Sequence, residues 1–269
     1  MDKVERINLP IGVFDSGLGG LTVVRAIKKI LPEESIVYLG DTAHLPYGTK
    51  SSDSIIKFSF ANTKFLIEQG VKAIVVACNT SSATALKKLK ESFSIPIFGV
   101  IEPGSVEAVK SSSFGKIGVI GTTATIRSKA YQRELKKLNS KLEIHAKSCP
   151  LFVPLIEEGW VDNEITFKVA EIYLSELIKS GVDTLILGCT HYPLIRDTIQ
   201  RVMGDGVKLI DSGEAVALWL KNFLKKEKIL AKNKNPFYHY YLTDFPQRFK
   251  KIAERFLGER IEIKKINLG

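Results

Sequence analysis

Short runs of consecutive apolar residues alternate, along the first 220 residues, with stretches in which apolar residues recur every three or four positions. An apolar run without interruption is typical of a strand buried on both faces, and the three-to-four period is typical of a helix. Strands and helices in alternation predict an α/β protein with parallel sheets. The clearest predicted strands are Ile11–Asp15, Ala73–Ala77, Ile117–Ile120 and Thr184–Leu187.

Two of these strand-and-helix units resemble two others further along the chain. Residues 12–16 (GVFDS) resemble residues 118–122 (GVIGT), and residues 70–80 (GVKAIVVACNT) resemble residues 181–191 (GVDTLILGCTH). The matches keep the same order and nearly the same offset. We therefore predict two pseudo-symmetric parallel-sheet α/β domains with the active site between them.

The pattern changes after residue 211, where the chain no longer repeats a unit seen before. We expect this tail to return to the first half and complete its sheet, which gives a first domain of residues 1–98 with 211–269 and a second of residues 99–210. The elements predicted in the tail are a helix over 215–225, an aromatic strand over 237–242, a helix over 247–257 and a strand over 261–266.

Composition excludes several classes of protein. Hydrophobic residues make up 45% of the chain and charged residues 25%, which is ordinary for a packed globular protein. No apolar run approaches the ~20 residues of a membrane helix, and the first residues lead into no signal-type segment, so we expect a cytoplasmic protein without a membrane partner. The net charge of +10 is spread over lysines interleaved with acids, and no known nucleic-acid motif accompanies it, so nucleic acid is not an expected partner.

The three cysteines occupy unequal contexts. Their odd number and wide spacing argue against a disulfide framework, and the absence of a Cys-x-x-Cys pair argues against a zinc or dithiol site. Burial as a small apolar side chain is the common fate of a free cysteine, and it fits Cys149. Cys78 and Cys189 instead follow two repeated strands, at the sheet edge where parallel α/β proteins bind ligands.

Paired thiols at equivalent positions indicate a chemistry. Two related halves that close on one ligand present one thiol to each face of it, which is the geometry for inverting a stereocentre by acid/base catalysis. A free thiol has a pKa of ~8.5, so a modest downward shift brings it into the working range. We expect a helix directly after each cysteine, and its N-terminus would favour the thiolate.

Polar residues cluster at the same strand ends and fit the binding of an amino acid. Each also has a structural interpretation as a helix cap or turn residue. The glycine-rich run over residues 15–20 (DSGLGG) matches neither dinucleotide- nor phosphate-binding loops, and a tight turn with positive φ explains its glycines. The candidate residues are Asp15, Ser16, Tyr47, Gly48, Asn79, Thr80, Thr122, Thr190 and His191.

Four motifs carry a resemblance to a known family: residues 14–20 (FDSGLGG), 46–48 (PYG), 77–83 (ACNTSSA) and 188–194 (GCTHYPL). They resemble the cofactor-independent aspartate/glutamate racemase family, and within it the bacterial glutamate racemases, over about residues 10–220. The resemblance implies a cytoplasmic enzyme that interconverts L- and D-glutamate and supplies D-glutamate for peptidoglycan. It also implies no pyridoxal phosphate, metal or nucleotide in catalysis, and often a homodimer.

The resemblance also implies roles for individual residues. Cys78 and Cys189 are the acid/base pair, with Cys189 acting on L-glutamate, and Asp15 and His191 assist them. A glutamate near the second cysteine assists too; we favour Glu157, while the adjacent Glu158 stays an alternative. The implied substrate shell is Asp15, Ser16, Tyr47, Gly48, Asn79, Thr80, Thr122, Thr190 and His191.

Two other functions stay open at this point. The same fold could racemise aspartate, although residues 189–193 (CTHYP) resemble the glutamate type. The cleft could also bind a ligand without turnover, but two intact cysteines argue against a binding module.

Overall fold

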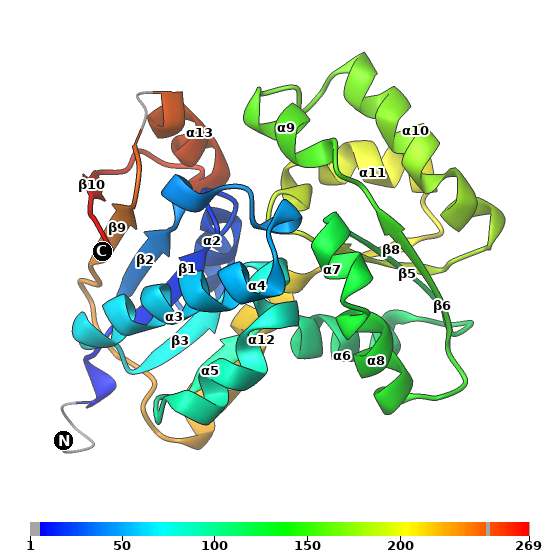
Figure 1. Ribbon diagram of the computed structural model, residues 1–269. Coiled ribbons are helices and arrows are strands. Elements are labelled where there is room, and N and C mark those ends of the chain that lie inside the picture. The colour runs from blue at the N-terminus through cyan, green and yellow to red at the C-terminus, as the bar shows by residue number, and fades with distance from the viewer. Residues whose placement is uncertain (1–5, 246–247, 269) are drawn as a thin grey trace.

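The computed structural model describes residues 6–245 and 248–268. It contains two parallel sheets, each covered by helices, side by side in one molecule (Figure 1). The strand order is β10-β9-β2-β1-β3-β4 in the first sheet and β6-β5-β7-β8 in the second, and all strand pairs described are parallel. The predicted α/β class with two parallel-sheet domains is confirmed.

The central strands are apolar and buried because helices cover both of their faces. Ile11 and Val13 of β1 face one part of the core, and Phe14 faces another on the opposite side of the sheet. The strands are β1 (Ile11–Asp15), β2 (Ile36–Gly40), β3 (Ala73–Val76), β4 (Ile97–Gly99), β5 (Lys116–Gly121), β6 (Glu143–Ser148), β7 (Thr184–Gly188), β8 (Lys208–Asp211), β9 (Tyr238–Leu242) and β10 (Ile263–Lys265).

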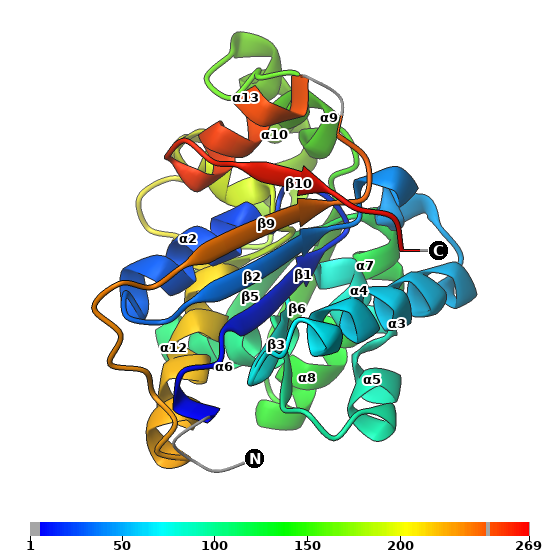
Figure 2. The same cartoon turned by 90° about the vertical axis from the view of Figure 1, so that its left-hand side faces the viewer.

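Helices α2 and α12 cover one face of the first sheet, while α3 and α5 cover the other (Figure 2). Short 3-10 turns η1 (Thr42–His44), η2 (Tyr47–Thr49) and η3 (Tyr192–Ile195) lie in the loops between strands and helices. The helices are α2 (Leu21–Ile30), α3 (Ser52–Glu68), α4 (Asn79–Thr84), α5 (Leu86–Ser92), α6 (Ile101–Ser111), α7 (Thr123–Arg127), α8 (Ala130–Leu138), α9 (Phe152–Glu157), α10 (Glu164–Lys179), α11 (Arg196–Met203), α12 (Ser212–Lys226) and α13 (Arg248–Leu257).

The two sheets share one topology, as the repeat in the sequence predicts. β1 lies between β2 and β3, and β5 lies in the same way between β6 and β7. The order β2-β1-β3-β4 therefore corresponds to β6-β5-β7-β8, with β3 equivalent to β7. Cys78 and Cys189 follow these two equivalent strands, which places both thiols at the carboxyl edge of their sheets.

The tail adds two strands to the first sheet. β9 pairs with β2 and β10 pairs with β9, so the chain returns to the first half after β8. β10 is shorter than the predicted 261–266, and Gln247, predicted to start the last helix, lies outside the described residues. The domain boundaries at 98/99 and 210/211 stay predictions. No helix within the described residues is long and apolar enough to cross a membrane.

Candidate active site

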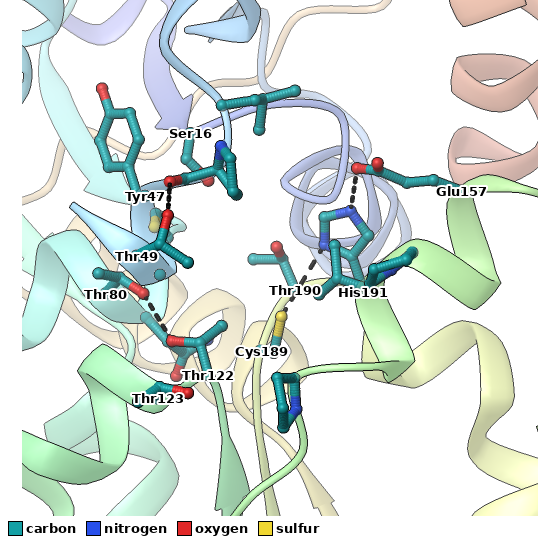
Figure 3. A pocket seen from close by; sticks show the side chains of 18 of the residues that line it. Ser16, Tyr47, Thr49, Thr80, Thr122, Thr123, Glu157, Cys189, Thr190 and His191 are labelled. Atoms are coloured by element: carbon teal, nitrogen blue, oxygen red, sulfur yellow. Dashed lines mark hydrogen bonds and ion pairs between the residues drawn. The ribbon is translucent and has the colours of Figure 1, made fainter. Parts of the chain in front are cut away.

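A cavity of about 350 Å³ opens where the carboxyl ends of the two sheets face each other (Figure 3). This volume is typical of a small-molecule site. Every predicted site residue except Asp15 lines it, and Asp15 is buried at the end of β1. The lining residues are Ser16, Leu45, Pro46, Tyr47, Gly48, Thr49, Cys78, Asn79, Thr80, Thr122, Thr123, Pro150, Val153, Pro154, Glu157, Glu158, Cys189, Thr190 and His191.

Cys78 caps the N-terminus of α4. Its Sγ accepts a hydrogen bond from the Ser81 amide at 3.4 Å, as the sequence predicts for a thiol before a helix. Burial, together with the nearby Asp15 carboxylate, nevertheless raises the pKa of Cys78 to about 11. The expected downward shift is therefore wrong for Cys78, because desolvation of the charged thiolate outweighs the hydrogen bonds from Ser81 and Ser16 that lower its pKa.

Cys189 has no α-helix directly behind it. Only the 3-10 turn η3 begins at Tyr192, and α11 starts at Arg196, so the expected helix N-terminus at this thiol is wrong. An imidazole stands there instead. Nδ1 of His191 lies 3.9 Å from Sγ of Cys189, and Nε2 of the same ring lies 3.0 Å from Oε1 of Glu157 (Figure 3).

The contacts of His191 decide its charge. Burial disfavours the charged imidazole, but the hydrogen bonds to Cys189 and Glu157 outweigh burial and raise the pKa of His191 to about 10. A cationic ring is thereby placed between a thiol and a carboxylate. Glu157 makes this contact from α9, whereas Glu158 lines the cavity beside it.

Asp15 joins the two halves beneath the cavity. Its Oδ2 accepts hydrogen bonds from the amides of Gly17 at 3.1 Å and Gly20 at 3.0 Å, and its Oδ1 accepts one from the Thr190 hydroxyl at 3.4 Å. Burial raises the pKa of Asp15, opposed by the nearby His191 and by these amides. The Asp15 carboxyl group thus links the glycine-rich loop of the first half to Thr190, the residue after Cys189 in the second half.

The glycine-rich loop owes its glycines to close approach rather than to backbone conformation. A Cβ built on Gly19 would overlap with Oγ1 of Thr190 and Nδ1 of His191. None of Gly17, Gly19 and Gly20 has the positive φ predicted for a tight turn, so that prediction is wrong. Their small size is needed for close packing instead: Gly19 packs against the second half, whereas Gly17 and Gly20 pack against side chains of the first half.

Hydroxyl groups from both halves meet at the other side of the cavity. Oγ1 of Thr80 lies 3.0 Å from Oγ1 of Thr122 (Figure 3). The Thr125 hydroxyl lies 3.2 Å from the first and 3.0 Å from the second. Asn79 is oriented by the Tyr131 hydroxyl, which donates to its side-chain oxygen at 2.7 Å. Since the described lining residues include no lysine or arginine, a carboxylate bound there would be met by hydroxyl and amide groups.

The loop that carries Tyr47 is anchored behind the cavity. The Tyr47 hydroxyl donates to Asp41, and Asp41 also accepts from Thr243 of the tail at 2.9 Å. A Cβ on Gly48 would lie 3.0 Å from Cβ of Thr122, so the loop packs closely on the second half. Tyr47 and Gly48 are therefore held at the cavity wall from two directions.

Sequence reasoning missed the apolar part of this wall. Leu45, Pro150, Val153 and Pro154 line the cavity. The last three belong to the family-like segment 149–159 that carries Glu157, but they were not predicted to line the site because they have no reactive or polar side chain. Thr49 follows directly after the Pro-Tyr-Gly motif and was equally unmarked. Among residues 6–245 and 248–268, no group of three or more His, Cys, Asp and Glu side chains is arranged to hold a metal ion.

Two related α/β halves each place one thiol, at equivalent strand ends, in the wall of one cavity. The sequence profile of the Asp/Glu/Hydantoin racemase family matches residues 11–218, which is most of the chain. The chain belongs to this family.

Individual relatives of high similarity are glutamate racemases. The chain is 47% identical to a glutamate racemase of Geobacter metallireducens over 93% of both chains, and 49% identical to that of Aquifex aeolicus over 95% of this chain and 97% of the relative. A glutamate racemase isoform of Bacillus anthracis superimposes with a TM-score of 0.94 at 42% identity, covering 97% of this chain and 98% of the other. The Francisella tularensis glutamate racemase, solved with D-glutamate, gives 0.91 at 44% identity with the same coverage.

Proposed function

We propose that the protein interconverts L- and D-glutamate, with Cys78 and Cys189 as its two acid/base groups. One observation carries the proposal. Two thiols from equivalent strand ends of the two related halves line the same small cavity. The likeness to glutamate racemases, one of them solved with D-glutamate, supports glutamate as the substrate.

The reaction moves one proton off each substrate molecule and another onto it. With L-glutamate, the Cys189 thiolate takes the Cα proton, so that the Cα–H bond breaks and an S–H bond forms. The Cys78 thiol then gives its proton to the opposite face of the resulting carbanion, which yields D-glutamate. The reverse direction exchanges the roles. The assignment of Cys189 to L-glutamate rests on the family resemblance.

The surroundings of the two thiols favour a protonated Cys78 and a thiolate at Cys189, the state from which L-glutamate reacts. A pKa of about 11 keeps Cys78 protonated at neutral pH, which makes it the donor. His191, with a pKa of about 10, is cationic and lies beside Cys189, where it would stabilise a thiolate. Glu157 in turn stabilises the charged ring, and Asp15 assists from beneath the site.

Substrate recognition is assigned to the polar wall of the cavity. Unpaired polar groups left by a shorter or neutral ligand cost about 1–3 kcal/mol each, so a wall matched to two carboxylates should prefer glutamate over aspartate and glutamine. Asp15 is proposed to support this polar wall through its hydrogen bond with Thr190. The other proposed binding residues are Ser16, Tyr47, Gly48, Asn79, Thr80, Thr122, Thr190 and His191.

The cellular setting is proposed from the resemblance to the family. The enzyme works in the cytoplasm, as a homodimer, and supplies D-glutamate for peptidoglycan. It uses no pyridoxal phosphate, metal or nucleotide in catalysis. Light scattering of the purified protein tests the dimer, since a monomer at micromolar concentration would contradict it.

The decisive assay uses protein dialysed against a chelator, without pyridoxal phosphate. L-glutamate, D-glutamate, L-aspartate and L-glutamine are supplied separately, and the enantiomers are separated by chiral chromatography. Glutamate should racemise in both directions, with kcat/KM far above that of aspartate. Loss of activity on dialysis, or an equal kcat/KM for aspartate, would refute the proposal. In D₂O, early D-product should carry deuterium at Cα while unreacted L-glutamate stays largely protiated.

A further inference from the structure

Helix α13 packs against the loop of residues 189–191 that carries Cys189 and His191, which we call the Cys189 corner. Its neighbours in the chain, β9 and β10, nevertheless belong to the first sheet. One face of the helix is buried in the core and packs on α2. On its other side, the helix approaches the loop after α9 (Figures 1 and 2). A Cβ built on Gly159 would lie 2.7 Å from Nη1 of Arg255, so the two segments are in close contact. Helix α13 therefore contacts both halves of the molecule.

Phe256 is the residue of α13 that reaches His191. Its side chain is fully buried, and its ring centroid lies 5.1 Å from that of the imidazole with the planes at 85°. The edge-to-face arrangement is a favourable one for aromatic rings. Phe256 does not line the cavity, so its ring contact with His191 is the direct route by which it can affect the chemistry.

The imidazole of His191 is thus confined by its own loop, which carries Cys189, and by three other segments: α9, the glycine-rich loop and α13. Cys189 and Glu157 contact its two nitrogens, the Gly19 backbone closes on Nδ1, and Phe256 packs on the ring. A phenyl ring offers no hydrogen-bonding group to compete for either nitrogen, and it covers one side of the buried imidazole with an apolar surface. The 3.9 Å contact to Cys189 is already long, so a small rotation of the ring would break it.

We propose that Phe256 is a positioning residue that holds His191 between Cys189 and Glu157. This inference rests on the proposed racemase function. Through it, the C-terminal part of the chain, which carries no motif, sets the geometry of one of the two thiols. The neighbouring Leu257 is buried in the same core and serves as the matched control.

The kinetic test compares Phe256→Ala, Phe256→Leu and Leu257→Ala. We expect Phe256→Ala to lower kcat for glutamate about tenfold with KM within about twofold, because sub-ångström misplacement of a catalytic group acts on the chemical step. Phe256→Leu should restore part of the loss, and Leu257→Ala should keep kcat within about twofold of wild type. Equal losses in Phe256→Ala and Leu257→Ala would show a merely structural role. If Phe256→Ala does not fold, Phe256→Leu against Leu257→Ala gives the same comparison.

A double-mutant cycle shows whether the effect passes through His191. In a His191→Gln background, Phe256→Ala should lower kcat by less than about twofold. A full multiplicative loss in that background would overturn the inference. A wild-type protein that fails to racemise glutamate would refute the proposed function instead, and the next measurement does not depend on activity.

The imidazole N–H that bonds to Glu157 gives a readout of ring position alone. Its proton resonance is assigned by its disappearance in His191→Gln. It should be sharp in the wild type and in Leu257→Ala, and broadened or lost in Phe256→Ala. An unchanged resonance in Phe256→Ala would contradict the positioning role.

Discussion

Cys78 and Cys189 follow equivalent strands of two sheets that share one topology, but the residues around the two thiols differ. We call the residues around Cys78 the Cys78 corner, by analogy with the Cys189 corner. Cys78 has a helix N-terminus and a buried carboxylate near it, and its pKa is raised to about 11. Cys189 has a cationic imidazole backed by a carboxylate and no α-helix N-terminus. A repeated fold has thus supplied equivalent positions, whereas loops and the tail have supplied unlike electrostatics.

That difference matters for an enzyme whose two substrates are mirror images. Because L- and D-glutamate are equally stable in water, kcat/KM must be equal in the two directions. Any asymmetry between the thiols must therefore appear in kcat, KM and isotope effects taken separately.

The largest effect should come from removing either thiol. Cys78→Ala and Cys189→Ala should each lower racemisation by about 10⁴-fold or more in both directions, because a proton must enter one face as another leaves the opposite face. Chiral chromatography measures the residual rate. Cys149→Ala is the matched control and should retain most activity, since Cys149 is buried outside the cavity wall. Substantial turnover by either of the first two variants would defeat the two-thiol mechanism.

A smaller effect should come from the groups that support only Cys189. His191→Gln should lower kcat about 10²-fold, and Glu157→Gln about tenfold, because both weaken the charge beside that thiol. In both variants the Cα-deuterium isotope effect should be larger with L-glutamate than with D-glutamate, since proton transfer at Cys189 becomes limiting.

The same measurement decides between the two adjacent carboxylates. Glu158→Gln serves as the comparison, because Glu158 lines the cavity beside Glu157. A larger loss in Glu158→Gln than in Glu157→Gln would reverse the assignment. Isotope effects larger with D-glutamate would exchange the faces assigned to the two thiols.

The loop between the corners gives a steric test. Gly19→Ala should lower kcat about tenfold and the free energy of unfolding by about 1–3 kcal/mol, because its Cβ overlaps with Thr190 and His191. Gly206→Ala is the control, since its Cβ would meet open space and its φ is not positive. Wild-type kcat in Gly19→Ala would show that the close approach does not position the imidazole.

The smallest effect separates the corners by pH. The pKa of His191 is raised from 6.5 to about 10 on folding, so its contribution to stability is complete below about pH 6.5 and is lost as the pH rises to about 10. The pKa of Cys78 is raised from 9.0 to about 11, so this thiol lowers the free energy of unfolding only as the pH rises between those two values. Urea unfolding should show a wild-type stability that declines above neutral pH by a few kcal/mol at most.

Variants should remove the two parts of that decline separately. His191→Gln should flatten the part below about pH 9, and Cys78→Ala the part above it. A wild-type stability that rises between neutral pH and about pH 10 would contradict both shifts.

The sequence allowed most of the fold and the chemical groups of the site to be predicted. Apolar runs and the internal repeat predict β1, β3, β5 and β7, and the tail pattern predicts β9 and β10, whereas β2, β4, β6 and β8 were not singled out. Polar residues after the predicted strands identify most of the polar cavity wall, from Ser16 to His191. What it could not give are contacts between segments distant in sequence. The overlap of Gly19 with His191, the ring of Phe256 and the burial that raises the pKa of Cys78 all depend on packing between the halves. Apolar residues in α13 predict a buried helix face, but not which residue it would touch.

The return of the tail to the first sheet has a consequence for protein synthesis. The ribosome releases β5 to β8 before β9 and β10, so the second sheet can assemble while β2 still lacks its outer neighbour. Until α13 emerges, the face of α2 that it covers stays open to solvent, and so does the side of His191 that Phe256 covers. A nascent chain therefore carries both thiols long before it carries their finished surroundings. Activity should appear only after β9, α13 and β10 have docked.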